Sequence, residues 1–460
     1  MNTHRLKRWT MAAALAAALP AIANAGANAA AASGAATAGA SANAIATATT
    51  AGGAPEIVGY YPGWKSDAFP VTAANVDAGR LTMALYAFLD VCWNGKHGNP
   101  EPSVNYVAPC QDAAGDAQSA NGALVFRDAA KDGANLRALV AMKRRHPNFK
   151  VVVSVGGWDW SNQFSNVADS AEARASFVAS SVKLMRRFGL DGVDIDWEYP
   201  TEAGVPCVAG AVCARPADKR NFITLARELR AAFDAAGRQD RKHYSITIAA
   251  GGNANYVNDG AAGGGWIAEL ARSLDWINIM TYDFHMPWEK RSGHHAALYA
   301  DVADPVTADG LYASASAQRY LRAGVAADKL VMGVPFYGYG WKGCAPGAAG
   351  DGQYQDCDGG AGGGVDGGNS YGFGHLLKLG YLTAGHEGGQ GFKRHWNGAA
   401  KAPYLYRAAD RVWISYEDPA SLEEKARYVK AQGLRGAMFW ELSADGGQQM
   451  LRALSAAMRK

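Results

Sequence analysis

The sequence has almost no excess of charge of either sign. Its 460 residues include 45 Lys and Arg and 42 Asp and Glu, a formal net charge of +3. Nucleic acids and anionic membranes are bound through concentrated positive charge, so we expect neither as a partner. Beyond residue 25, no segment is long and apolar enough to span a bilayer. We therefore expect a soluble protein.

The N-terminus has the three parts of a secretory signal peptide. A basic segment at 5–8 precedes a short apolar segment at 11–22, and Ala23-Asn24-Ala25 follows as a cleavage site. The apolar segment is too short for a membrane span, so a retained anchor is the less favoured alternative. We predict a signal peptide over 1–25, cleavage near Ala25 and a secreted protein, extracellular or periplasmic.

Residues 26–54 consist almost entirely of Ala, Gly, Ser and Thr. With so little apolar surface to bury, this segment is expected to be a disordered linker. A strand-like segment of apolar residues follows directly after residue 55, and no further domain is recognisable in the sequence. The folded unit is therefore predicted over 55–460.

Cysteine is scarce, and no two of the six cysteines have C-x-x-C spacing. That spacing is typical of zinc sites, so we expect no metal. In an exported protein an even number favours disulfides, although six cysteines allow fifteen pairings. Closeness in sequence favours the pairs Cys92–Cys110, Cys207–Cys213 and Cys344–Cys357. The adjacent His294 and His295 have no acidic or histidine neighbours at ligand spacing and are expected at the surface.

Glycine-rich nucleotide motifs are also missing. No G-x-G-x-x-G follows the first strand-like segment, and the loop GGNANYVNDGAAGGGW lacks the Lys-Ser/Thr of a P-loop. This disfavours an open doubly wound sheet, and we expect no cofactor.

Eight short apolar segments alternate with amphipathic segments of helical length. In 171–188, for example, an apolar stripe is followed by basic residues and then Gly189. This alternation predicts an α/β protein with a parallel sheet, and eight units over about 400 residues favour a (β/α)8 TIM barrel. The predicted strands are 57–61, 81–89, 150–156, 192–198, 244–250, 276–282, 330–337 and 435–441.

The interval 338–411 is too long for an ordinary loop of such a barrel. It contains a glycine-rich stretch and then patterned segments such as KAPYLYRAADRVWISY. A structureless loop of this length is uncommon in a compact domain. We predict a small α+β insertion subdomain after the seventh strand.

The stretch DGVDIDWEYP at 191–200 combines alternating carboxylates with apolar residues. In a strand, Asp194, Asp196 and Glu198 share one face, with neighbours about 6.6–7 Å apart. Crowded carboxylates share protons, which raises the pKa of one of them as a general acid requires. Glu198 would lie at the strand end, where such barrels place catalytic residues. A calcium loop or a solvated strand face is the alternative interpretation.

Several motifs together resemble family 18 of the glycoside hydrolases, the chitinases. DGVDIDWE is similar to that family's D-x-x-D-x-D-x-E signature, and the likeness extends over most of 56–446. It includes SVGGW at 154–158, MTYDFH at 280–285, AMFWELSAD at 437–445, and the segments WISYEDPASLEEKARYV and HWNGAAKAPYLY. The last segment is similar to the insertion of the deep-cleft subfamily.

The resemblance implies a mechanism in which the substrate supplies the nucleophile. Glu198 would protonate the glycosidic oxygen, and the N-acetyl carbonyl of the bound sugar would attack C1. Asp196 would hold the acetamido N–H and Tyr282 would orient the carbonyl. Asp194 would exchange a proton with Asp196.

The resemblance also implies residues that contact or support the substrate. Aromatic faces suit the C–H-rich faces of pyranose rings. For Met280, and for each of the tryptophans at 64, 158, 160, 288 and 341, packing is about equally expected. The implied set is Trp440, Met280, Asp283, Trp158, Tyr60, Ser154 and Gly157.

The resemblance therefore implies a secreted chitinase that acts on chitin and chitooligosaccharides with retention of configuration. We expect a monomer. Two alternatives remain open: a non-catalytic chitin-binding lectin of the same fold, and an endo-β-N-acetylglucosaminidase that acts on N-glycan cores.

Overall fold

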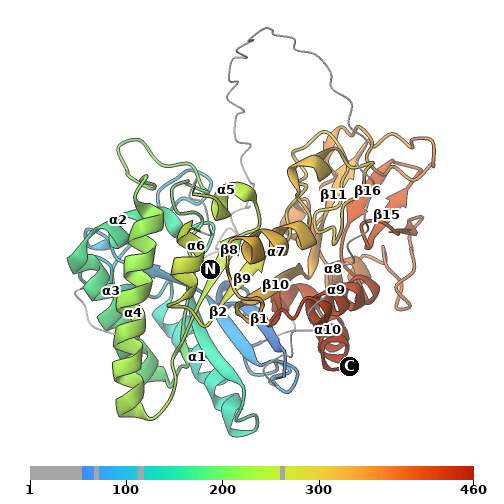
Figure 1. The fold of residues 1–460 in the computed structure, drawn as a ribbon. Coiled ribbons are helices and arrows are strands. Elements are labelled where there is room, and N and C mark those ends of the chain that lie inside the picture. The colour runs from blue at the N-terminus through green and yellow to red at the C-terminus, as the bar shows by residue number, and fades with distance from the viewer. Residues whose placement is uncertain (1–53, 67–71, 112–118, 260–264) are drawn as a thin grey trace, which may run out of the picture.

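The computed structural model describes residues 54–66, 72–111, 119–259 and 265–460. The predicted signal peptide, and residues 26–53 of the predicted linker, lie outside these ranges. Eight parallel strands close into a barrel (Figure 1), because β1 pairs with both β17 and β2. This confirms the predicted TIM barrel. The strands are β1 Glu56–Pro62, β2 Met83–Val91, β6 Lys150–Gly156, β7 Gly192–Asp196, β8 Ser245–Gly251, β9 Trp276–Met280, β10 Leu330–Pro335 and β17 Gly436–Trp440.

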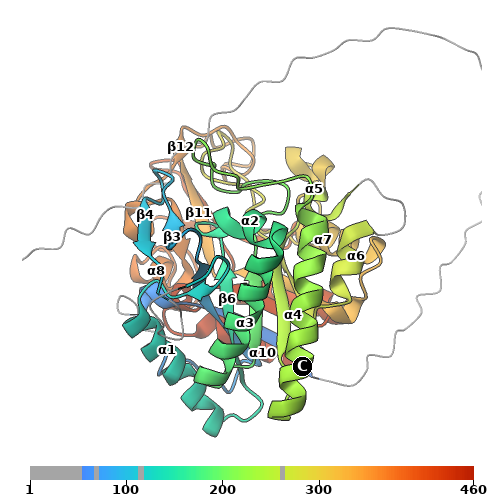
Figure 2. The same cartoon turned by 90° about the vertical axis from the view of Figure 1, so that its left-hand side faces the viewer.

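Helices cover the outside of the barrel (Figure 2). The predicted helix 171–188 is observed as α3, which begins at the N-cap Ser170 and ends at Gly189 with φ of 71°. None of the helices in the described ranges is long and apolar enough to cross a membrane. The helices of the barrel are α1 Ala129–Ala141, α2 Phe164–Asp169, α3 Ala171–Phe188, α4 Asp218–Asp240, α5 Ala254–Val257, α6 Gly265–Ala271, α7 Ala313–Arg322, α9 Pro419–Ala431 and α10 Gln449–Arg459.

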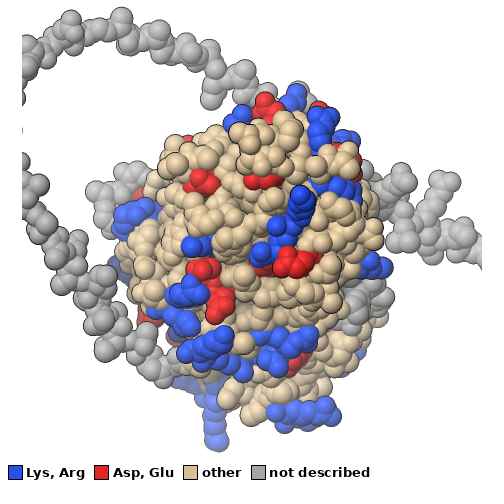
Figure 3. Space-filling view, turned by 90° about the vertical axis from the view of Figure 1, so that its right-hand side faces the viewer, with Lys and Arg blue, Asp and Glu red and all other residues tan. Residues whose placement is uncertain are grey.

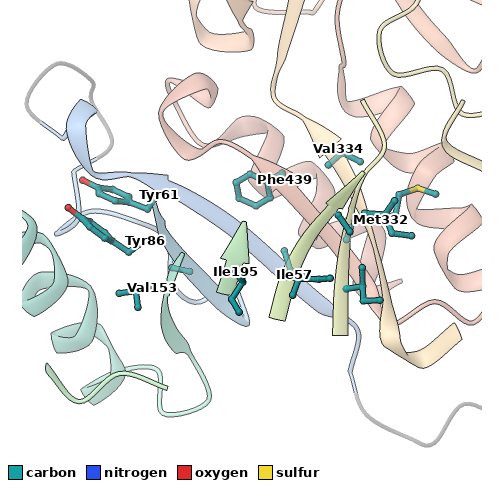
Figure 4. Packing of buried hydrophobic residues seen from close by; sticks show 14 of the residues in the cluster. Ile57, Tyr61, Tyr86, Val153, Ile195, Met332, Val334 and Phe439 are labelled. Carbon is teal, nitrogen blue, oxygen red and sulfur yellow. The ribbon is translucent and has the colours of Figure 1, made fainter. Parts of the chain in front are cut away.

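Alternation along the strands produces two distinct layers. Outward side chains such as Ile57, Ile195 and Phe439 belong to the large core between strands and helices (Figure 4). Inward side chains such as Val58 and Met438 form a smaller core inside the barrel. Polar side chains that share the inner face are therefore enclosed by protein.

An α+β insertion follows β10, as predicted. Its antiparallel sheet has the order β12-β11-β16-β15-β14, and β13 pairs with β11. The first strand begins one residue before the predicted start of the insertion, and the last ends beyond its predicted end. The elements are β11 Tyr337–Lys342, β12 Gly359–Gly360, β13 Ser370–Gly372, α8 Phe373–Lys378, β14 Lys393–Asn397, β15 Ala402–Arg407 and β16 Val412–Ser415.

The three cysteine couples are disulfide-bonded as predicted. Cys92–Cys110 encloses the hairpin of β3 Lys96–Asn99 and β4 Tyr106–Pro109, and β5 Leu124–Val125 pairs antiparallel with β2. Cys344–Cys357 lies in the aromatic core of the insertion. Each disulfide therefore ties a connection rather than a barrel strand.

The expectation of a surface position for His294 and His295 is wrong. Both side chains are buried, because the insertion covers them with aromatic residues such as Trp413. His295 Nδ1 lies 2.8 Å from Ser415 Oγ at the end of β16. Burial lowers the pKa of His294 to about 4 and that of His295 well below its usual range. Both rings are therefore neutral and join the barrel to the insertion.

A buried ionic cluster holds the long connection between β9 and α7. His285 Nδ1 lies 2.7 Å from Glu289 Oε2, and His285 Nε2 lies 3.0 Å from Asp304 Oδ1. Burial alone would lower the pKa of His285, but hydrogen bonds to the two carboxylates, and their charges, raise it to about 9. The imidazolium is therefore the charged partner of two carboxylates.

This cluster predicts a pH-dependent stability. The pKa of His285 rises from 6.5 in the unfolded chain to about 9 in the folded protein. Its stabilisation is therefore complete below the unfolded value and is lost as pH rises through about 9. Compared with H285Q, the wild type should lose about 1–3 kcal/mol of its free energy of unfolding over this interval.

Denaturant unfolding of both proteins at closely spaced pH values measures this difference. D304N should reduce the loss by removing one of the two carboxylates. Parallel pH dependence of wild type and H285Q would contradict the role assigned to His285.

Candidate active site

The carboxylates of DGVDIDWEYP lie at the carboxyl end of β7. Ile195 and Trp197 face the outer core, where the Trp197 ring stacks on Phe164 at 5.5 Å. Asp194 and Asp196, on the alternate positions, therefore face the barrel interior. β7 ends at Asp196, two residues earlier than the predicted strand, and Glu198 follows in the adjoining turn.

Asp194 is completely buried and accepts four side-chain hydrogen bonds. Tyr60 Oη and Ser154 Oγ donate to Oδ2 at 2.9 and 2.7 Å. Thr247 Oγ1 and Asn278 Nδ2 donate to Oδ1 at 2.5 and 3.3 Å. Burial raises the pKa of Asp194, and these hydrogen bonds offset part of that rise.

Thr247 and Asn278 were missed by the sequence reasoning. Asn278 is the single polar residue of β9, whereas Thr247 shares the otherwise apolar β8 with Ser245, and both Thr247 and Asn278 are fully buried. Polar residues in otherwise apolar barrel strands are the signal that could identify them, since a buried polar group requires a partner.

Asp196 is buried next to Glu198 and has an unused hydrogen-bonding atom. Its Oδ1 has no hydrogen-bond partner among the described residues. Burial, followed by the negative charges of Glu198 and Asp194, raises the pKa of Asp196 well above its usual range. A proton shared with Glu198 is therefore favoured, and the free oxygen can accept a hydrogen bond from a bound molecule.

Glu198 is half-buried and has a pKa of about 7. Burial raises the pKa most, the charges of Asp283 and Asp159 add to the rise, and hydrogen bonds with Tyr199 and Asp196 oppose it. The carboxyl group therefore exchanges its proton near neutral pH, as a general acid and base requires.

Ser161 holds the backbone that carries Glu198. The Glu198 N–H donates to Ser161 Oγ at 2.8 Å, and this hydroxyl lies 2.8 Å from the Gly157 carbonyl and 3.0 Å from the Asp196 carbonyl. One buried hydroxyl thus joins the loop after β6 to the end of β7. Gly157 has φ of 77°, and a Cβ there would meet the Phe88 ring at 2.5 Å. Gly157 therefore also permits close packing at this junction.

Tyr282 and Asp283 follow β9 on another side of the carboxylates. The Tyr282 hydroxyl lies 4.0 Å from Met438 Sδ, and its ring contacts Tyr337 edge-on. Asp283 is exposed to solvent and accepts a hydrogen bond of 2.6 Å from Tyr337 Oη. The surrounding protein nevertheless desolvates this carboxylate and raises its pKa to about 6. Both residues are therefore held beside the insertion.

A cluster of aromatic rings lies beside the carboxylates. The Trp440 ring is half-buried and stacks on Phe88 at 5.6 Å, with Tyr60 at 5.3 Å and Trp64 at 6.2 Å. Met280 is also half-buried and packs against the inner core together with Trp440. These residues form an aromatic wall with a solvent-accessible side.

A shallow hollow opens on the Glu198 side of the site. Trp158 is 46% exposed and is one of its lining residues, together with Glu198 and Ser161. Cys213, of the disulfide Cys207–Cys213, also borders it. Of the other loop tryptophans, Trp64 and Trp288 are exposed, whereas Trp160 and Trp341 are buried. Packing therefore accounts for the last two.

The insertion forms another border of the site. The aromatic core of its sheet, which includes Tyr337 and Tyr339, contacts Tyr282, Met286 and Trp440. Among the described residues, no group of three or more His, Cys, Asp or Glu side chains is placed to hold a metal ion. The chemistry available here is therefore that of carboxylates, tyrosines and aromatic faces.

Comparisons with known proteins agree with this geometry. The sequence model described as Glycosyl hydrolases family 18 matches residues 56–445. Chitinase A1 of Niallia circulans is 42% identical over 422 residues, which cover 87% of this chain but only 58% of that protein. Chitinase B of Serratia marcescens is 32% identical over 428 residues, covering 82% of this chain and 76% of that protein. The structure of chitinase ChiA74 from Bacillus thuringiensis has a TM-score of 0.79 at 37% identity and covers 88% of this chain and 70% of that one.

The contacts of Ser161 predict that it is a positioning residue. In S161A the Glu198 N–H loses its partner, so kcat should fall about 10–100-fold while KM changes less than about 3-fold. S161T should restore most of kcat because it retains the hydroxyl. Steady-state kinetics on a soluble chitooligosaccharide measures these values.

Ser165 offers a matched control. It is also buried and bonds Asp218 at 2.8 Å, away from the carboxylates. S165A should lower the melting temperature without lowering kcat. Equal losses of kcat in S161A and S165A would contradict the positioning role of Ser161, because general destabilisation would then explain both losses.

Proposed function

The chain belongs to glycosyl hydrolases family 18, and on this premise we propose that it hydrolyses chitin. The bond cleaved is the β-1,4 linkage between N-acetylglucosamine residues. Support comes from the relatives named chitinase and from the arrangement of Glu198, Asp196 and Asp194. The observation that carries the proposal is a half-buried Glu198 with a pKa of about 7 beside a buried aspartate whose Oδ1 is free.

Glu198 is assigned as the general acid and base. In the first step its proton passes to the glycosidic oxygen and the bond from that oxygen to C1 breaks. The carbonyl oxygen of the sugar's own acetamido group forms the new bond to C1 and yields a cyclic oxazolinium ion. In the second step the oxygen of a water molecule bonds to C1, the bond from C1 to the acetamido oxygen breaks, and the Glu198 carboxylate takes the proton that the water gives up. Two displacements on C1 leave its configuration unchanged.

Asp196 and Tyr282 are assigned to the acetamido group. The free Oδ1 of Asp196 can accept the acetamido N–H, and its negative charge stabilises the oxazolinium. The Tyr282 hydroxyl can donate to the acetamido carbonyl oxygen, because its hydrogen-bond partner among the described residues is the Met438 sulfur 4.0 Å away, a weak acceptor. Correct orientation of the internal nucleophile is what these two groups contribute.

Asp194 is assigned to proton balance rather than to substrate contact. With four hydrogen-bond donors its carboxylate tolerates burial. The proton that Asp196 shares with Glu198 in the free enzyme can move toward Asp194 when Asp196 binds the acetamido N–H. Proximity of the three groups raises the pKa of Asp196 and favours this transfer.

The aromatic and exposed residues of the site are assigned to sugar binding. Trp440 offers a ring face beside the carboxylates, and Trp158 offers an exposed ring on the Glu198 side. Met280 and Asp283 are also assigned to sugar contact. Tyr60 and Ser154 act through Asp194, to which they donate, and Gly157 acts through Ser161, which donates to its carbonyl. A site bordered by the insertion suits chitooligosaccharides of several sugars.

Export is also proposed, from the predicted signal peptide. The mature protein should begin near Gly26. Sequencing the N-terminus of the exported protein tests this, and an intact Met1 would contradict it.

Replacement of the proposed acid tests the activity. E198Q keeps the size of the side chain but cannot donate a proton as the acid does, so kcat on chitooligosaccharides should fall by at least about 10²–10⁴-fold. Binding, measured by calorimetry, should be retained. E202Q removes an exposed carboxylate four residues later and should leave kcat unchanged.

Unaltered turnover by E198Q would contradict the assignment of the acid. Binding without turnover in the wild type would favour the lectin of the same fold. Cleavage of N-glycan cores with no cleavage of chitooligosaccharides would favour the endo-β-N-acetylglucosaminidase.

A further inference from the structure

An open groove lies between α1 and α3, far along the barrel from the carboxylates. Its volume is about 340 Å³, within the range of small-ligand sites. The groove lies at the ends of α1 and α3, which lead into the first residues of β6 and β7. Glu198, by contrast, follows the last residue of β7. The groove and the active site are therefore at opposite ends of the strands. It is lined by Arg137, Val140, Ala141, Arg144, Arg187 and Phe188.

Three arginines of this groove have no anionic partner in the part of the chain that the structure describes. Arg137, Arg144 and Arg187 are exposed, and within the described residues none of their guanidinium groups forms an ion pair or hydrogen bond. The Arg187 guanidinium lies 5.4 Å from the centre of the Phe188 ring. Three unpaired guanidinium groups thus surround an apolar floor.

Two carboxylates bound by the neighbours Lys143 and Arg186 of these arginines already have cationic partners. Lys143 and Lys242 bind Asp191 at 2.6 and 2.9 Å, and Arg186 binds Asp240 at 2.8 Å. On the opposite face of the molecule, basic and acidic side chains are interspersed near the middle and basic side chains gather along the lower edge (Figure 3). The groove is lined from α1 and α3, which are labelled in Figure 2, and carries three arginines that have no anionic partner among the described residues.

We propose that this groove binds an acidic polysaccharide. A guanidinium group can bind a carboxylate or sulfate through two parallel hydrogen bonds, and three of them match a chain with repeated anionic groups. The Phe188 ring and Val140 supply an apolar surface for the C–H faces of the sugar rings. The groove is open along the surface, so a linear chain can enter without threading.

A polysaccharide is favoured over other polyanions. Membrane binding requires apolar side chains that project from the surface, whereas the apolar floor here is recessed between two helices. Nonspecific nucleic-acid binding requires a more extended basic surface, and the net charge of the chain is only +3. The choice of a polysaccharide also rests on the proposed function, because a chitin-degrading protein works among carbohydrate polymers.

Binding of polygalacturonate to the full chain tests the proposal. We expect affinity that falls about tenfold or more between about 50 and 200 mM NaCl, as for a polyanion held by several charges. The variant R137Q/R144Q/R187Q should bind at least about tenfold more weakly, and R144Q alone about 2–4-fold more weakly.

A matched control removes the same charge elsewhere. Arg220, Arg272 and Arg322 are exposed and form no side-chain ion pair within the described ranges. The variant R220Q/R272Q/R322Q should bind polygalacturonate within about twofold of wild type. The melting temperatures of all variants show whether they fold. If R137Q/R144Q/R187Q does not fold, the weaker binding expected of R144Q alone still tests the proposal.

Three results would overturn the proposal. They are equal losses of binding in the two triple variants, no measurable binding by the wild type, and tighter binding of duplex DNA or phosphatidylserine vesicles than of polygalacturonate. Hydrolysis of chitooligosaccharides is measured separately. If R137Q/R144Q/R187Q loses polygalacturonate binding but still hydrolyses chitooligosaccharides, the proposal for the groove is supported. If the wild type binds polygalacturonate through the groove but hydrolyses no chitooligosaccharide, only the proposed function is overturned.

Discussion

Burial of the Asp194 carboxylate inside a closed barrel is the constraint on which the rest of the site depends. A buried carboxylate is costly unless several donors satisfy it. Here the donors Tyr60, Ser154, Thr247 and Asn278 come from β1, β6, β8 and β9. Only a closed sheet brings side chains from both sides of β7, and from across the barrel, to one carboxylate. The fold and the chemistry are therefore linked at this residue.

The raised pKa values of Asp196 and Glu198 follow from this arrangement. The alternation along β7 that directs Asp194 inward also directs Asp196 inward, above it and toward the strand end. Proximity to Asp194 and Glu198, added to burial, raises the pKa of Asp196, and the pKa of Glu198 reaches about 7. In the proposed mechanism the acid can therefore be protonated at neutral pH while Asp196 awaits a hydrogen-bond donor. In this proposed mechanism the substrate supplies the nucleophile, so no protein side chain need reach C1.

Local sequence patterns predicted the parts of the molecule that depend on periodicity. The alternation in DGVDIDWEYP identified the shared face of the carboxylates, and the repeated strand and helix segments identified the barrel. Patterns along the chain could not reveal contacts between distant segments. The donors Thr247 and Asn278, and the clamp formed by Ser161, depend on neighbouring strands. The surface position expected for His294 and His295 is wrong because the aromatic side chains that bury them, such as Tyr337 and Trp413, come from the insertion, a separate part of the sequence.

The central claim is that the acetamido group of the substrate is the nucleophile. The most direct measurement compares two chitooligosaccharides that differ only at the sugar preceding the cleaved bond, which carries either an N-acetyl group or a free amine. The account predicts cleavage of the first with retained β configuration at C1 and no measurable cleavage of the second at equal binding. Equal cleavage rates for the two substrates would contradict it.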